Sequence, residues 1–370
     1  MTEPDITARY GDDPPLPITE WYFDTAHRDS TQGTKRVVRP IMEDFQSFLD
    51  ERGIYAWELT LDDARDWLLK NKDEKGAVRQ KQWATYSSDL YKFCNERGVS
   101  SFDGNPIKLK LRESPNLVDE ELSRDPHIVS VNEMSEYISS FKLPLYVAIS
   151  TTMVKCLLRA GATINLDLMD VNISHPACDW EVHPNIRHKA DYIHIPRDPQ
   201  EGEEFRGEVR GVSNKTSVTR VTPIDDELRD VLLFYLTTRP DEAGWSGEDP
   251  LFAQHTGFGS YGSRIPNSSL KRVVRKHSKK LGHWYGSYDD DNINCHYMRH
   301  WGSTMLEEKE DVPKSIVKLL RGDKGDTIDT YLHWTDQKEN IYKRNVPKFF
   351  GSEQALEDLS GYHLGRFNND

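Results

Sequence analysis

The sequence predicts a mainly α-helical protein with a small antiparallel β-sheet, organised as two domains. Apolar residues recur at helical spacing through the first third of the chain. Short strand-like segments, at 192–195 and 218–224, interrupt the helical pattern of the remainder. The length of 370 residues leaves room for two domains and a sizeable core.

The N-terminal part reads as a helical domain over residues 18–112, after a tail (1–17) that is rich in Pro and Asp and expected to be disordered. One apolar stripe, ended by Gly53, consists of Val38, Ile41, Phe45 and Phe48. Thr60 is a suitable N-cap for a following helix. A second stripe consists of Trp83, Tyr86, Leu90 and Phe93. These aromatic residues are expected to pack in a core.

The C-terminal part reads as a larger domain over residues 130–350, separated from the first by a linker at 113–129 and followed by a tail at 351–370. Ser130 and Glu133 have the spacing of a capping box that opens a helix. Lys215 is expected in a tight turn between two short strands, 207–212 and 218–224. The acidic run at 225–227 favours the start of the next helix.

The charge balance is unusual for a protein that binds nucleic acid. The net charge is −13, whereas affinity for nucleic acid usually rests on cations that neutralise phosphates. Against this balance, the segment 271–280 carries six basic residues at helical spacing: Lys271, Arg272, Arg275, Lys276, Lys279 and Lys280. The protein therefore either avoids nucleic acid or combines an acidic surface with a locally basic binding face.

The four cysteines (Cys94, Cys156, Cys178 and Cys295) are scattered without a C-x-x-C pair, so they indicate neither a zinc site nor a disulfide framework. We expect no metal, and buried thiols at Cys156 and Cys295. No apolar run is long enough to span a membrane, and the N-terminus lacks the basic start of a signal peptide. These features predict a soluble, cytoplasmic protein.

The segment His296-Tyr-Met-Arg299-His300 is the most informative motif. On one helix, residues three and four apart share a face, so these side chains would be aimed at one point. A guanidinium group matches two phosphate oxygens, and Tyr331 supplies a hydroxyl nucleophile farther along the chain. Upstream, Arg159 precedes Gly161, and Lys215 offers a proton donor.

In their order and spacing, Arg159, Lys215, His296, Arg299 and Tyr331 resemble the catalytic residues of tyrosine recombinases, the phage-integrase family, over residues 130–350. Haloarchaeal members look most similar, because they share strings such as Arg159-Ala-Gly161 and Arg321-Gly-Asp323. Two positions depart from the family pattern. Ala162 stands where most members have Glu, and Asp323 is the nearest candidate for the position of a second active-site His or Trp.

The resemblance implies an N-terminal core-binding (SAM-like) domain that clamps DNA and a C-terminal catalytic domain. Arg159 and Arg299 would bind the scissile phosphate, Tyr331 would form a 3′-phosphotyrosyl link, and Lys215 would protonate the leaving 5′-oxygen. His296 would assist proton transfer, with no metal, ATP or other cofactor. Further DNA contacts are expected from the basic helix and from Lys35, Arg36, Arg79 and Lys81. By resemblance, four copies would assemble on double-stranded DNA.

Several functions remain open at this point. The first is a site-specific recombinase, such as the integrase of a mobile element. A host chromosome-dimer resolvase or a type IB topoisomerase would use the same chemistry. Ala162 and Asp323 instead motivate a catalytically impaired DNA-binding protein of the same fold. A metal-dependent nuclease is disfavoured, because no carboxylate cluster accompanies the His and Arg residues.

Overall fold

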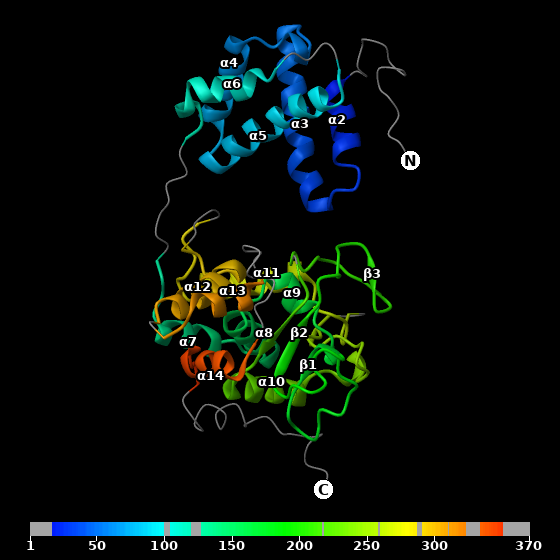
Figure 1. The fold of residues 1–370 in the computed structure, drawn as a ribbon, viewed down its shortest axis with the longest axis vertical. Coiled ribbons are helices and arrows are strands. Elements are labelled where there is room, and N and C mark those ends of the chain that lie inside the picture. The colour runs from blue at the N-terminus through cyan, green and yellow to red at the C-terminus, as the bar shows by residue number, and fades with distance from the viewer. Residues whose placement is uncertain are drawn as a thin grey trace. The chain divides into compact units, whose positions relative to one another are not determined.

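The computed structural model describes residues 17–99, 104–119, 127–216, 218–257, 260–286, 291–309, 311–322 and 334–350. The chain divides into two compact units, Met1–Asp125 and Pro126–Asp370, which have separate hydrophobic cores (Figure 1). Of the two tails predicted from the sequence, only Pro17 lies within the described residues.

The first unit is helical, as predicted. Its helices are α2 (Ile18–Ala26), α3 (Gln32–Arg52), α4 (Leu61–Glu74), α5 (Ala77–Glu96) and α6 (Pro106–Glu113). The predicted stripe of α3 is buried throughout, and α3 ends at Gly53 in the left-handed conformation (φ +65°). The Thr60 hydroxyl accepts a hydrogen bond from the Asp63 amide at 3.1 Å, which confirms the predicted N-cap of α4.

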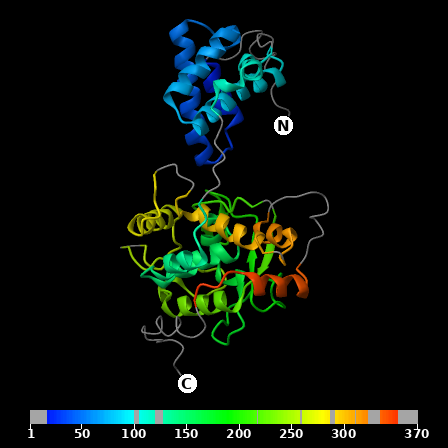
Figure 2. The same ribbon diagram turned by 90° about the vertical axis from the view of Figure 1, so that its left-hand side faces the viewer.

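The second unit is built around α8 (Pro144–Lys155). This helix packs against both α10 (Asp226–Thr238) and α12 (Cys295–Glu307), and every residue from 147 to 155 is buried. A helix that is covered on all sides is expected to be mostly apolar, and α8 is so apart from Ser150, Thr151, Thr152 and Lys155. The two threonine hydroxyls donate to the Val147 and Ala148 carbonyls at 2.8 and 2.7 Å. Figures 1 and 2 show α12 on one side of α8 and α10 on the other.

The described part of this unit also contains the α-helices α7 (Val131–Ser139), α9 (Ala160–Ile164), α11 (Asn267–Lys280), α13 (Lys314–Arg321) and α14 (Asp336–Asn345). The Ser130–Glu133 capping box at the start of α7 is confirmed. So is the acidic start of α10, where the Asp225 side chain accepts from the Leu228 amide at 3.1 Å.

The sheet consists of β1 (Val171–Asn172), β2 (Tyr192–Ile195) and β5 (Arg220–Pro223), all antiparallel, in the order β1-β2-β5. The expected pair of strands joined by a tight turn at Lys215, 207–212 and 218–224, does not form a hairpin. The partner of β5 is β2, with Ile195 opposite Arg220. Residues 196–219 leave the sheet between these strands and form a separate hairpin of β3 (Glu204–Phe205) and β4 (Glu208–Val209).

Candidate active site

Helix α12 carries the histidines and the arginine of the predicted motif. Asn294 caps the helix by accepting hydrogen bonds from the amides of His296 and Tyr297. His296 and His300 are exposed, and their rings meet edge to face with centroids 4.7 Å apart. Arg299 lies on the inner side of the same turn, with only 1% of its surface exposed. The predicted placement on one helix is therefore confirmed, with the guanidinium group directed inward.

The end of α8 brings the two arginines to one segment of backbone. Leu157 adopts the left-handed conformation (φ +51°) as the helix ends, and its carbonyl accepts a hydrogen bond from Nη1 of Arg299. Two residues later Arg159 is the N-cap residue of α9. The close approach of α12 to α8 requires Gly302, because a Cβ atom there would lie 2.3 Å from the Val154 carbonyl oxygen.

Residues 212–216, called the Lys215 turn below, lie against Arg159 and Gly161. Nη1 of Arg159 donates a hydrogen bond to the Lys215 carbonyl at 3.0 Å. Lys215 is exposed and adopts a positive φ of 50°. Gly161 permits this contact, because a Cβ atom there would lie 2.3 Å from the Ser213 carbonyl oxygen. Arg159, Lys215 and Arg299, predicted from three distant parts of the sequence, thus meet around one stretch of backbone.

The end of α13 completes the described part of the site. The Arg321 carbonyl accepts a hydrogen bond from Nη2 of Arg299 at 3.0 Å. Arg220, a second cation close to Lys215 in the sequence, donates from Nε to the Leu320 carbonyl at 3.2 Å. The chain then enters the segment 323–333. The predicted nucleophile Tyr331 and the candidate Asp323 lie outside the described residues.

The pKa of His296 is lowered from its ordinary value. Partial desolvation is the main cause, and the positive charges of His300, Arg299, Arg159 and Arg321 lower it further. The electrostatic influence of three arginines on one imidazole agrees with the hydrogen bonds above: these cations share a small volume. His296 is therefore neutral at pH 7, able to accept a proton.

The predicted DNA-binding residues are mostly exposed. On α11, all six basic residues from Lys271 to Lys280 are exposed, while Leu270, Val274 and Ser278 form the buried face. In the first unit, Arg36, Arg79 and Lys81 are exposed. Lys35 is half-buried, and its ammonium group donates to the Arg28 carbonyl at 2.6 Å, so it is the least suited of the four to a phosphate contact.

A buried ion cluster beside the site has no counterpart in the sequence-based prediction. Asp167 and Asp170, both fully buried, follow α9 in the chain. Their carboxylates accept hydrogen bonds from the guanidinium groups of Arg206, Arg210 and Arg264. Arg206 and Arg210 belong to the hairpin β3–β4, so the cluster ties this hairpin to the core. Its partners are 36–97 residues apart, and no local pattern in the sequence joins them.

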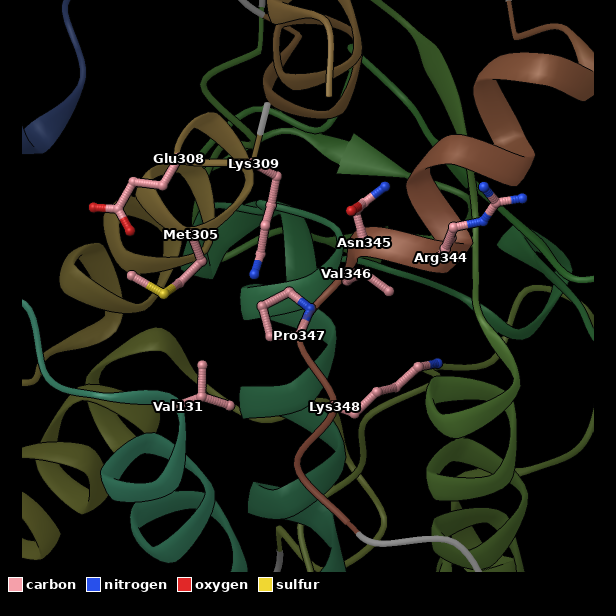
Figure 3. Close-up of a pocket in the computed structure, with 9 residues that line it drawn as sticks. All are labelled: Val131, Met305, Glu308, Lys309, Arg344, Asn345, Val346, Pro347 and Lys348. Carbon is pink, nitrogen blue, oxygen red and sulfur yellow. The ribbon is translucent and has the colours of Figure 1, made fainter. Parts of the chain in front are cut away.

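A cavity of about 410 Å³ among the described residues lies more than two helical turns from His296 along α12. In Figure 3, Lys309 reaches toward this space between Met305 and Val346. Lys348 extends away from it, and its ammonium group donates to Asp225. The basic side chains at this cavity do not converge on a common point, so it does not form an anion site.

Among the described residues, no group of three or more His, Cys, Asp or Glu side chains is arranged to hold a metal ion. None of their helices is both long enough and apolar enough to cross a bilayer.

No protein-family model and no curated protein matches the sequence. Solved structures do resemble the fold. The Tn1549 transposon integrase in complex with circular intermediate DNA aligns with a TM-score of 0.60 and 14% identity, over 87% of this chain and 97% of that one. A lambda integrase tetramer bound to a Holliday junction aligns with a TM-score of 0.55 and 16% identity, over 88% and 83% of the two chains.

These similarities cover both units and show a shared fold. The protein shares the fold of these integrases: a helical first unit is followed by a second unit that is mostly helical with a small antiparallel sheet. The fold class predicted from the sequence is thus confirmed. Identities of this size concern the fold alone, and the chemistry has to be argued from the residues.

Proposed function

We propose that this protein is a tyrosine-type site-specific DNA recombinase, which cuts and rejoins DNA through a 3′-phosphotyrosyl intermediate. The observation that carries the proposal is the meeting of Arg159, Arg299 and the Lys215 turn around residues 157–159. Fixed cations aimed at one point stabilise the charge that develops on the phosphate oxygens during transfer. The chain shares its fold, over both units, with proteins crystallised with DNA.

The proposed residues account for each bond and each proton in the reaction. The Tyr331 hydroxyl gives its proton to neutral His296, and its oxygen forms a bond to phosphorus. The bond from phosphorus to the 5′-oxygen breaks, and that oxygen takes a proton from the Lys215 ammonium group. The phosphotyrosyl link conserves the energy of the broken strand, so a free 5′-hydroxyl can reverse every step. We propose that neither ATP nor a metal ion takes part.

The exposed basic face of α11, together with Arg36, Arg79 and Lys81, is the proposed contact to the DNA backbone. A local face of this kind reconciles DNA binding with the net charge of −13. Lambda integrase has been crystallised as a tetramer on a Holliday junction, and we propose a tetramer on DNA for this chain as well. Its DNA substrate agrees with the cytoplasmic location expected from the sequence.

A second function is favoured by one specific observation: Arg299 is 1% exposed, and both its terminal nitrogens donate to main-chain carbonyls. A protein whose arginine stayed enclosed in this way would bind DNA without transferring strands. The retention of Lys215 beside Arg159 favours the recombinase, because a binding protein has no use for a proton donor there.

Covalent trapping distinguishes these functions. The protein is incubated with nicked DNA from the region bordering its gene, in high salt with a chelator. We expect a protein–DNA adduct from the native chain and none from Tyr331→Phe, with equal DNA binding by both. Binding by the native chain without an adduct, on DNA confirmed as its specific site, would favour the binding protein. An adduct that survives in Tyr331→Phe would contradict the choice of nucleophile.

A further inference from the structure

We infer that Asn165 is a positioning residue, which fixes the Lys215 turn against the helix of Arg159 so that the proton donor and the cation meet the same phosphate. The inference rests on the proposed recombinase chemistry and extends it to a residue with no catalytic group of its own.

The Lys215 turn has no ladder of strand hydrogen bonds to hold it. The sheet ends at the Ile195–Arg220 pair, and residues 196–219 between them lie outside its ladder. Outside a ladder, a backbone segment has to be positioned by side chains or water. The support for the Lys215 turn is therefore to be sought in side chains from neighbouring elements.

Asn165 supplies that support. This residue is buried (1% exposed) and follows the last residue of α9, the helix that Arg159 begins. Its side-chain amide donates to the Val212 carbonyl at 2.7 Å and to the Asn214 side-chain oxygen at 2.8 Å. One amide thus holds the backbone at Val212 and the side chain of Asn214, the residue that precedes Lys215.

Asn214 connects the Lys215 turn to a further segment of the chain. This neighbour of Lys215 is also 1% exposed, and its side chain donates to the Pro196 carbonyl at 2.7 Å. Its backbone amide donates to the Pro199 carbonyl at 3.1 Å. The two asparagines therefore join the helix of Arg159, the Lys215 turn and the start of the excursion from the sheet.

The geometry of the turn explains why such a device is needed. Lys215 adopts a positive φ of 50°, which costs a non-glycine residue free energy. Without an external tie the turn would relax, and the lysine would move relative to the phosphate site. Because proton transfer requires hydrogen-bond distance, a shift of about 1 Å is enough to reduce the rate by roughly 100-fold.

The test separates loss of the proton donor from general damage. Adduct formation is measured in single turnover on two DNA substrates, one ordinary and one with sulfur in place of the bridging 5′-oxygen. A thiol, with a pKa of about 8.5, leaves as the anion, whereas an alcohol needs a proton. Lys215→Ala is the reference variant, expected to be slow on the oxygen substrate and close to native on the sulfur substrate.

For Asn165→Ala we expect the same selectivity: at least about tenfold slower cleavage of the oxygen substrate, with the sulfur substrate within about threefold of the native rate. Asn172→Ala is the matched control. Asn172 also donates two amide hydrogen bonds to backbone, to the carbonyls of Ile186 and Lys189 at 2.8 and 3.0 Å, but it supports another loop. It should show no selectivity between the substrates.

Thermal unfolding shows whether each variant is folded. If Asn165→Ala fails to fold, the same comparison is made with Asn214→Ala, which removes the hydrogen bond from the side of the turn. Equal loss on both substrates, or no loss, would overturn the positioning role while the recombinase function stood. Absence of any adduct from the native chain on either substrate would overturn the proposed function, and this inference with it.

Discussion

On one side of the candidate site Arg299 is buried and its terminal nitrogens donate to main-chain carbonyls, whereas on the other side Lys215 sits on an exposed turn tied by side-chain amides. Backbone carbonyls at the ends of α8 and α13 cannot move without disturbing the core. A turn outside a strand ladder can move more easily. The arginine that would stabilise charge on the phosphate is thus fixed by the core, whereas the lysine that would donate the proton lies on a turn held by side-chain hydrogen bonds.

We call these the arginine side and the lysine side of the site. A change on the arginine side should affect both the free energy of unfolding and the cleavage rate. A change on the lysine side can affect the cleavage rate alone. A buried guanidinium group of this kind contributes to stability as well as to catalysis, because its removal leaves the carbonyls that it binds without this donor. An exposed lysine side chain can be removed with little effect on the free energy of unfolding. Three experiments test this comparison, given in order of decreasing expected effect.

The largest effect is expected from Arg299→Ala. The change leaves the Leu157 and Arg321 carbonyls without this donor and opens space in a packed region. We expect the free energy of unfolding to fall by about 3–5 kcal/mol and the cleavage rate to fall by at least about 100-fold. Denaturant unfolding and adduct formation are the measurements.

Arg187→Ala is the control for Arg299→Ala, since Arg187 is exposed in the same unit. Its free energy of unfolding should change by less than about 0.5 kcal/mol. An Arg299→Ala protein as stable as the native chain would show that the buried hydrogen bonds contribute little, and the contrast between the two sides would fail.

An intermediate effect is expected from Gly161→Ala, which tests the contact between the two sides. The added Cβ atom would meet the Ser213 carbonyl oxygen at 2.3 Å, so the Lys215 turn or the start of α9 must shift. We expect a loss of about 1–3 kcal/mol in the free energy of unfolding. Cleavage should slow more on a substrate with an oxygen leaving group than on one with sulfur.

Gly211→Ala is the matched control for Gly161→Ala. Gly211 lies in the same excursion from the sheet, but a Cβ atom there would meet no atom within 4 Å. It should be close to native in stability and rate. If Gly161→Ala behaved as Gly211→Ala does, the close packing of α9 on the turn would have no consequence for the site.

The sequence predicted correctly those features that depend on residues close together in the chain. The helical spacing of His296, Arg299 and His300 predicted α12, and the polar residues at Thr60, Ser130 and Asp225 predicted helix starts that the structure contains. Caps and apolar periodicity act over a few residues, so a sequence displays them directly.

The sequence was insufficient where partners are distant. The prediction placed Lys215 in a tight turn between the segments 207–212 and 218–224, because neighbouring strand-like segments usually form a hairpin. The structure pairs β5 with β2 instead, since Arg206 and Arg210 hold the intervening residues on Asp167 and Asp170. A sequence gives no sign that charged residues such as these are removed from solvent. Only the folded chain shows that Arg210, Asp167 and Asp170 are buried and that Arg206 is half-buried.

The smallest effect is expected from a change in pH, which acts through the exposed His296 on the arginine side. The lowered pKa of His296, caused by partial desolvation and then by neighbouring cations, means that the folded chain binds this proton less readily than the unfolded chain. His296 therefore contributes a stability that falls as the pH drops below the ordinary histidine pKa of about 6.5. The proposed transfer of the Tyr331 proton needs the same neutral form.

We therefore expect the single-turnover cleavage rate to be level at pH 7 and to fall only below about pH 6.5, with a midpoint under that value. His296→Gln should lower the level rate and remove this acid limb, whereas His188→Gln, at an exposed position, should retain it. A limb centred above pH 6.5, or one unchanged in His296→Gln, would assign the titrating group elsewhere. The arginine side would then act on the phosphate alone, and the acceptor of the Tyr331 proton would have to be sought beyond α12.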